Sequence, residues 1–156
     1  MRVGVPREIK ADEYRVGLTP TAVREYVVHG HQVSVERGAG QGAGYGDEAY
    51  LRAGATILPD AAAVFSDSQL IVKVKEPQAQ EWARLTREHI LFTYLHLAPD
   101  PAQTEGLLAS GCAAIAYETV TDAQGGLPLL APMSEVAGRL AVFSAGETLL
   151  DRKSVV

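Results

Sequence analysis

Cysteine, net positive charge and long apolar runs are scarce in this sequence, and each shortage excludes a class of protein. The single cysteine, Cys112, rules out an internal disulfide and a zinc site built on cysteines. A formal net charge of −5 argues against nucleic-acid or anionic-membrane partners, which are bound through clustered lysine and arginine. No run approaches the roughly 20 apolar residues of a membrane span, and the N-terminus has no apolar signal core. We therefore expect a cytoplasmic protein.

The composition and the pattern of apolar residues indicate one ordinary globular domain of the α/β class. The chain has 156 residues, of which 47% are hydrophobic and 21% are charged. Strands are predicted at 3–5, 32–36, 55–57, 70–75, 90–96 and 113–117. Helices are predicted at 20–29, 47–53, 59–65, 78–87 and 101–110, and a last one begins near Met133 or Ser134. This alternation predicts a doubly wound, Rossmann-like, mostly parallel sheet with helices on both faces.

The stretch from Ile90 to Pro101 is the clearest strand, and it ends in a polar residue. Ile90, Phe92, Tyr94 and His96 would share one face of that strand. Both faces are mostly apolar, as expected for a strand covered on both sides. His96 would be the last residue before the chain turns. Ligands of open parallel sheets bind beyond the carboxyl ends of the strands, so His96 is a candidate for chemistry.

Three polar residues from distant parts of the sequence converge on this carboxyl edge: Arg15, Lys75 and His96. Arginine offers a fork to a carboxylate, lysine a charge that polarises a carbonyl, and histidine a proton donor or acceptor. The set suits a small anionic substrate and the oxidative deamination of an amino acid, which also needs a hydride acceptor. Simpler interpretations stay open. Arg15 would then be a solvated ion-pair partner, Lys73 and Lys75 part of a charged edge strand, and His96 a structural histidine.

A glycine-rich segment, residues 38–46, satisfies a relaxed dinucleotide-binding pattern through Gly38, Gly40 and Ala43, with Asp60 at about the expected distance. Its context differs from that of the motif, because the glycines run on for nine residues before Asp47 caps a short helix. We expect a flexible surface loop, with cofactor binding as the alternative.

Cys112 lies in a segment that is typical of the start of a buried strand. We expect an inert core thiol there, because free cysteine is among the most buried residue types.

Six stretches of the chain resemble the N-terminal part of the alanine dehydrogenase family. They are VGVPREIK (3–10), RVGLTP (15–20), VKVKEP (72–77), LFTYLHLA (91–98), IAYETV (115–120) and LPLLAPMSEVAGR (127–139). Together they cover about 140 residues in register, and the last is highly specific. The N-terminal domain of the transhydrogenase alpha subunit is similar in fold and in its opening motif, but it lacks the Tyr-Leu-His element that ends here at His96.

The resemblance implies roles for individual residues. Arg15 and Lys75 would bind the carboxylate and carbonyl of pyruvate, or the corresponding groups of alanine, and His96 would be the proton donor and acceptor. Tyr94 would help to shape the pocket, and Ser134 would contact the cofactor. Family members transfer hydride between alanine and NAD reversibly and assemble as homo-hexamers. NADP as the cofactor and other small 2-oxo acids as substrates remain open.

The end of the chain departs from the family pattern. The resemblance implies a substrate and catalytic domain at 1–133, followed at 134–150 by the start of a linker helix. The NAD-binding domain to which that helix leads in the family is missing from this chain. Residues 151–156 resemble a translated sequencing adapter, so we expect a non-native tail and a truncated, inactive dehydrogenase whose last helix exposes its apolar face. The alternatives are a transhydrogenase alpha-subunit domain and a stand-alone, non-catalytic small-molecule binding module.

Overall fold

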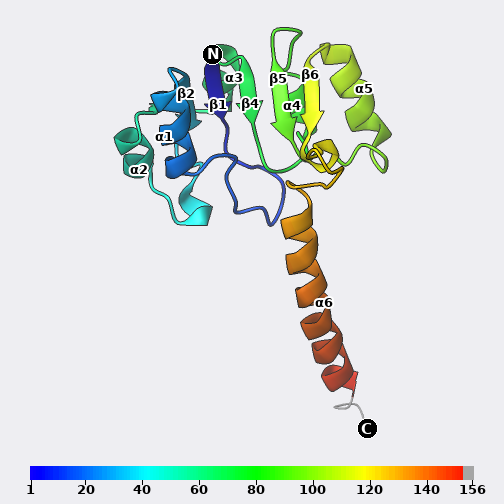
Figure 1. Cartoon of the computed structure of the whole chain (residues 1–156). Coiled ribbons are helices and arrows are strands. Elements are labelled where there is room, and N and C mark those ends of the chain that lie inside the picture. Colours follow the sequence, from blue (N-terminus) through cyan, green and yellow to red (C-terminus); the bar gives the residue numbers. More distant parts are fainter. Residues whose placement is uncertain (153–156) are drawn as a thin grey trace. The chain divides into compact units, whose positions relative to one another are not determined.

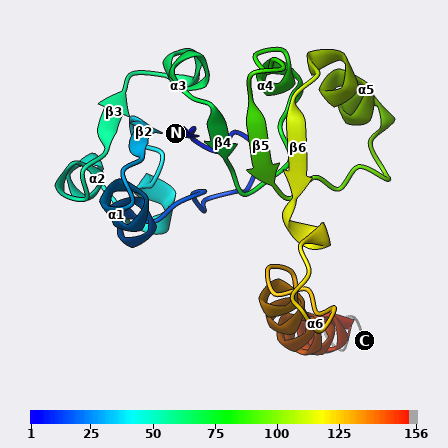
Figure 2. The ribbon, with the colours of Figure 1, turned by 45° about the horizontal axis from the view of Figure 1, so that its top comes forward.

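A parallel sheet organises the first part of the chain in this computed structural model, which describes residues 1–152. Its strands are β1 (Arg2–Val5), β2 (Gln32–Glu36), β3 (Thr56–Leu58), β4 (Leu70–Val72), β5 (Ile90–Thr93) and β6 (Ala113–Ala116). Their order across the sheet is β3-β2-β1-β4-β5-β6, and every neighbouring pair is parallel (Figures 1 and 2). The predicted doubly wound α/β fold is therefore confirmed.

Helices cover both faces of this sheet. Figure 2 shows α1 (Pro20–Val28) and α2 (Asp47–Arg52) on one face, with α3 (Ala61–Asp67), α4 (Ala79–Trp82) and α5 (Pro101–Ser110) on the other. The start of α1 follows the prediction, because the Thr19 side chain accepts a hydrogen bond from the Ala22 amide and Pro20 occupies the first turn.

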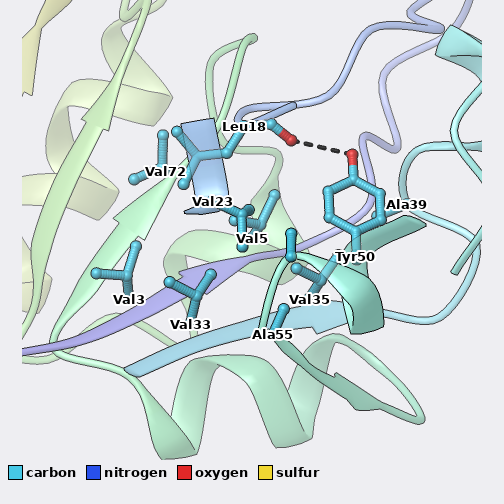
Figure 3. Packing of buried hydrophobic residues seen from close by; sticks show 11 residues of the cluster. Val3, Val5, Leu18, Val23, Val33, Val35, Ala39, Tyr50, Ala55 and Val72 are labelled. Carbon is cyan, nitrogen blue, oxygen red and sulfur yellow. Dashed lines mark hydrogen bonds between the residues drawn. The ribbon is translucent and has the colours of Figure 1, made fainter. Parts of the chain in front are cut away.

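Each face has its own apolar core. On the face of α1 and α2, valines of β1 and β2 pack around Tyr50, whose hydroxyl donates to the carbonyl oxygen of Leu18 at 3.0 Å (Figure 3). On the other face, Ile71 of β4 and Leu91 of β5 pack with Phe65 and Leu107. Ile71 and Val72 are adjacent yet belong to different cores, which is the alternation expected of a strand covered on both sides.

Two strands end earlier than the sequence pattern predicts. β4 stops at Val72, so neither Lys73 nor Lys75 lies in a strand. β5 stops at Thr93, and His96 follows with a positive φ of 49°. The prediction that Lys75 and His96 are the last strand residues is therefore wrong. Side-chain alternation continues beyond the point where inter-strand pairing stops, so it does not mark the end of a strand.

Three other local predictions also need correction. The helix predicted at 78–87 is limited to α4, although Leu85 is buried and Trp82 packs against the second core as expected. Gly46, not Asp47, is the N-cap of α2. β6 is an edge strand with mostly exposed residues, and Cys112 just before it is only partly buried, so the predicted buried strand is wrong.

A second compact unit begins at Tyr117, after the unit Met1–Ala116. It contains a 3₁₀ turn (Tyr117–Thr119), the predicted turn at Asp122, and α6 (Ala131–Arg152), which begins slightly before the predicted residue. As expected, α6 exposes apolar side chains, including Val136, Leu140 and Phe143. Among the helices of residues 1–152, none combines the length and hydropathy of a bilayer span. Most of the expected non-native tail, residues 153–156, lies outside the described residues.

Candidate functional site

The sheet order places a topological switch point between the carboxyl ends of β1 and β4. Successive strands are added on one side of β1 as far as β3 and then on its other side from β4 to β6. Ligands of doubly wound folds bind at this kind of topological switch point. Two segments emerge at that edge, residues 6–19 after β1 and residues 73–78 after β4. The first carries Arg15 and the second carries Lys75.

Arg15 is held by a neighbouring carboxylate. Its Nε and Nη2 groups donate to the two oxygens of Glu13 at 2.8 and 2.6 Å, and the Arg15 amide donates to Glu13 as well. The hydrogen bond from Arg15 lowers the pKa of Glu13 more than any other contact does. Arg15 thus forms the ion pair that the simpler interpretation expects, and in this pair its guanidinium fork holds a carboxylate.

Lys75 lies near the same carboxylate. Its charge also lowers the pKa of Glu13, so the ammonium is within electrostatic reach of the group that Arg15 holds. The Lys75 carbonyl oxygen accepts a hydrogen bond of 2.8 Å from the Thr93 hydroxyl, which ties this segment to the end of β5. Next to it, burial alone would raise the pKa of Glu76, but the hydrogen bond from Lys10 reverses the net shift to a lower value.

The residues after β5 reach the same edge. The Tyr94 amide donates to the Val74 carbonyl oxygen at 3.2 Å, and the Tyr94 side chain interacts electrostatically with Arg15. His96 is exposed and lies two residues further on, in the left-handed region of backbone conformation. The first unit therefore gathers Arg15, Lys75 and Tyr94, with His96 on the same connection. Ser134 belongs to the second unit, in the first turn of α6.

A buried ion cluster beneath these residues was missed by the sequence analysis. The Lys73 ammonium lies 3.1 Å from Glu8 Oε2 and 2.8 Å from Glu81 Oε1, and all three residues are buried. Burial raises the pKa of Glu8, and the charge of Lys73 and the Val74 amide oppose that shift. The available signal was a lysine inside an apolar run, because a buried ammonium needs carboxylate partners. The edge-strand interpretation of Lys73 is wrong.

A cavity of about 450 Å³ opens beside Arg15. It is lined by the loop after β1 and by the glycine-rich segment, and the lining includes Glu13, Tyr14, Arg15, Gln41 and Gly42. A Cβ on Gly42 would lie 2.7 Å from the Tyr14 carbonyl oxygen. The glycine at this position therefore lets the two loops approach each other closely.

The glycine-rich segment does not fit a dinucleotide. The Gly38 amide donates to the Asp47 carboxylate at 2.8 Å, and a 3₁₀ turn (Gln41–Ala43) separates these glycines from the start of α2. Asp60, the candidate ribose ligand, caps α3 instead and accepts from the Ala63 amide at 2.8 Å. These contacts agree with the preferred interpretation of a surface loop, because they engage the Gly38 amide and the Asp60 carboxylate that a dinucleotide motif would use.

The sheet order and the position of the candidate residues define a Rossmann-like domain with Arg15 and Lys75 at the switch point of its sheet. The family model described as the alanine dehydrogenase/PNT N-terminal domain matches residues 4–137, and the chain belongs to this family.

Curated relatives and solved structures agree with this assignment. The chain is 55% identical over 149 residues to an alanine dehydrogenase of Halomonas elongata, covering 96% of this chain and 40% of that protein. It is 53% identical over 141 residues to an alanine dehydrogenase of Mycobacterium tuberculosis, covering 90% and 38%. A solved L-alanine dehydrogenase superposes with a TM-score of 0.86 at 50% identity, covering 91% of this chain and 39% of that one.

A transhydrogenase from Sinorhizobium meliloti is a more distant structural neighbour, with a TM-score of 0.71 at 26% identity over 76% of this chain and 35% of that chain. The chain spans about two fifths of the length of the curated alanine dehydrogenases that it matches. It therefore corresponds to their N-terminal part.

Proposed function

We propose that this chain is the substrate-binding part of an NAD-dependent alanine dehydrogenase, which interconverts L-alanine with pyruvate and ammonium. The main observation behind this proposal is the contact between Arg15 and Glu13. Arg15 holds the Glu13 carboxylate through two donors, and that carboxylate lies within electrostatic reach of Lys75. A 2-oxo acid presents a carboxylate next to a carbonyl. A planar fork beside an ammonium suits both groups, since the fork binds the carboxylate and the ammonium polarises the carbonyl.

The remaining residues of the proposal act around this pair. His96 donates and accepts the proton during addition of ammonia and loss of water, a role suited to an imidazole near neutral pH. Tyr94 shapes the pocket, in agreement with its electrostatic interaction with Arg15. Ser134 contacts the cofactor. These roles come from the family, and the support from this chain is that Arg15, Lys75, Tyr94 and His96 all follow strands at one sheet edge.

The cofactor and the assembly are also parts of the proposal. NAD would supply the hydride acceptor, bound by a part of the protein outside the glycine-rich loop of this chain. In this scheme residues 1–133 form the substrate and catalytic domain and residues 134–150 the linker helix. A cytoplasmic location and hexameric assembly are supported by the family resemblance alone. The dehydrogenase is favoured over the transhydrogenase alpha subunit because the identities are 50–55% against 26%.

The test is calorimetric titration of pyruvate into the purified chain and its variants. We expect weak, saturable binding that Arg15→Lys and Lys75→Met each reduce on the order of tenfold or more, because each removes one of the two polar anchors. Arg15→Lys keeps the charge and loses the fork, so it separates bidentate binding from simple charge attraction. His96→Ala should change affinity less, since its proposed role is proton transfer.

The matched control is Arg24→Ala, which removes an exposed cation from α1 and should leave binding unchanged. Absence of pyruvate binding by the folded chain would contradict the proposal. Equal losses for Arg24→Ala and Arg15→Lys would point to a general effect of net charge, and they would also overturn the assigned site. A further outcome is that the chain binds pyruvate but supports no turnover with NAD, even when it is joined to the remaining length of a relative. That result would favour the non-catalytic binding module.

A further inference from the structure

The loop that carries Arg15 is attached to the end of β4 at two points. Near its start, the Glu8 carboxylate accepts a hydrogen bond of 2.6 Å from the Val74 amide and lies 3.1 Å from the Lys73 ammonium. Near its end, Gly17 lies against the backbone of β4, where an added Cβ would overlap the Val72 carbonyl oxygen. Arg15 lies between these two points of attachment.

The first attachment is buried, so removing either partner would leave an unpaired charge in the interior. The Lys73 side chain is 1% exposed and that of Glu8 is 2% exposed, so solvent screens their attraction very little. In contrast, the Arg15 side chain is 43% exposed. Arg15, the exposed group proposed to bind substrate, thus lies in a loop whose first residues are fixed by the buried pair of Glu8 and Lys73. Lys75 follows Val74 directly. The hydrogen bond from the Val74 amide to Glu8 therefore fixes the backbone next to Lys75 relative to the loop that carries Arg15.

Glu81 completes the charge cluster from another element. It lies 2.8 Å from Lys73, and its second oxygen accepts from the Gln78 amide at 2.8 Å, closing the start of α4. Glu8 and Glu81 therefore make equivalent contacts, each with the same ammonium and with one backbone amide. They differ in what they hold: Glu8 holds the Arg15 loop, and Glu81 holds α4.

From this geometry we propose that Glu8 is a positioning residue of the substrate site, which with Lys73 fixes Arg15 relative to Lys75. The inference rests on the proposed function and adds a residue that contacts no substrate itself. The Arg15 guanidinium and the Lys75 ammonium can bind one 2-oxo acid at the same time only if the distance between them is fixed. If either group is displaced, the substrate is bound by one group alone and the affinity falls.

The experiment compares Glu8→Ala with Glu81→Ala in the full 156-residue chain. Each variant removes one carboxylate from Lys73, leaves the other in place, and leaves one backbone amide without its carboxylate. We therefore expect similar decreases in melting temperature. Glu8→Ala should raise the pyruvate dissociation constant on the order of tenfold, while Glu81→Ala changes it less than about twofold. Both titrations are made well below the melting transition, so only folded protein is compared.

Amide hydrogen exchange provides a readout that does not need pyruvate. In Glu8→Ala, exchange should accelerate at Val74 and in the loop, where the Glu13 amide bonds to the Lys10 carbonyl oxygen. In Glu81→Ala, it should accelerate in α4 and leave the loop unchanged. If the wild-type chain does not bind pyruvate, the proposed function fails. Amide hydrogen exchange of the loop in the two variants then tests by itself whether Glu8 positions Arg15.

Equal exchange of the loop in the two variants would overturn the inference, as would equal losses of affinity. Gly17→Ala gives a second route, because it displaces the other attachment point without changing any charge. It should also weaken pyruvate binding, whereas Gly46→Ala, where an added Cβ meets nothing within 4 Å, should not. Wild-type affinity in Gly17→Ala would contradict the two-point attachment.

Discussion

Arg15 in the candidate site and Lys73 in the ion cluster below it contact carboxylates in different environments. The Arg15–Glu13 pair is partly exposed on the arginine side, where ion pairs contribute about 0–1 kcal/mol. The side chains of Lys73, Glu8 and Glu81 are at most 3% exposed, and removing one partner of such a pair costs about 3–5 kcal/mol. The first pair can therefore rearrange when a ligand binds, whereas the second fixes the backbone.

Tyr50 should make the stability of the domain depend on pH in the alkaline range. Burial raises the pKa of Tyr50 from 10.0 to about 12, with smaller contributions from Tyr45 and Asp47. A folded-state pKa above the unfolded value gives a contribution that is complete below pH 10 and is lost as the pH rises through about 12. Tyr50→Phe should remove this loss. It should also cost about 1–3 kcal/mol below pH 10, because the buried Leu18 carbonyl loses its donor.

The measurement is urea unfolding of both proteins at pH values below 10 and between 10 and 12. The other titrating groups are common to both proteins, so the difference between the two curves isolates Tyr50. Parallel pH profiles would contradict the assignment of the shift to this phenol.

Gly42 should tolerate a methyl group poorly. Gly42→Ala places a Cβ 2.7 Å from the Tyr14 carbonyl oxygen and 3.0 Å from its Cβ, so we expect a loss of about 1–3 kcal/mol in the free energy of unfolding. Gly46→Ala is the control, since its φ is −76° and an added Cβ meets nothing within 4 Å. Because Gly46 is the N-cap of α2, its change should be limited to the loss of a glycine cap, below about 1 kcal/mol. Similar losses in the two variants, measured by urea denaturation, would argue against close packing of the two loops.

At the scale of the element, short helices depend on their caps. α3 has seven residues, and the Asp60 carboxylate holds its first turn through the Ala63 amide. α1 uses Thr19 in the same way. The prediction that a helix spans 59–65 put Asp60 inside it, whereas α3 begins at Ala61 and Asp60 is its N-cap. The position of Asp60 after a glycine-rich loop also imitates the ribose ligand of a dinucleotide site, and only the hydrogen bond distinguishes the two roles.

Asp60→Ala tests the capping role. We expect a loss of about 0.5–2 kcal/mol in the free energy of unfolding, measured by chemical denaturation, because the Ala63 amide loses its acceptor. Asp60→Asn should recover most of the stability, since asparagine caps helices about as well as aspartate. An unchanged stability of Asp60→Ala would favour the ribose-ligand role. So would NAD binding that is seen in the wild-type chain and lost in this variant.

At the scale of the whole molecule, the chain contains the first part of a longer arrangement found in its relatives. It matches a model of an N-terminal domain and spans about two fifths of the curated alanine dehydrogenases. Its glycine-rich loop uses its amides and neighbouring carboxylates for internal contacts. The candidate substrate groups thus lie in the first part of the family protein, and the proposal places NAD in another part.

We expect that the purified 156-residue chain does not reduce NAD in the presence of alanine. The measurement is the absorbance of reduced NAD at alkaline and at neutral pH. This expectation follows from the proposal that NAD is bound by another part of the family protein. A full-length relative assayed in parallel controls for the conditions. Turnover by the isolated chain that disappears in Lys75→Met would show that this expectation is wrong.

The sequence by itself determined the class of fold and most of its elements. β2 and α5 have the predicted bounds, and β1 and β6 lie within one residue of theirs, because alternation of apolar residues and local caps report on local geometry. It also placed Arg15 after a strand and Lys75 and His96 at the carboxyl ends of strands, which in a parallel sheet is enough to bring them to one edge. Family motifs supplied the roles that this placement alone could not assign.

Only the tertiary structure decided how that edge is built. Glu8 and Lys73 are 65 residues apart in the sequence, and nothing local indicates that their charges meet in the interior. The ends of β4 and β5 depend on pairing with neighbouring strands, and the exposure of β6 depends on its position at the edge of the sheet. These properties arise from contacts between distant segments. A pattern with a period of two or 3.6 residues reports which side chains share a face, and it contains no information about the partner of that face.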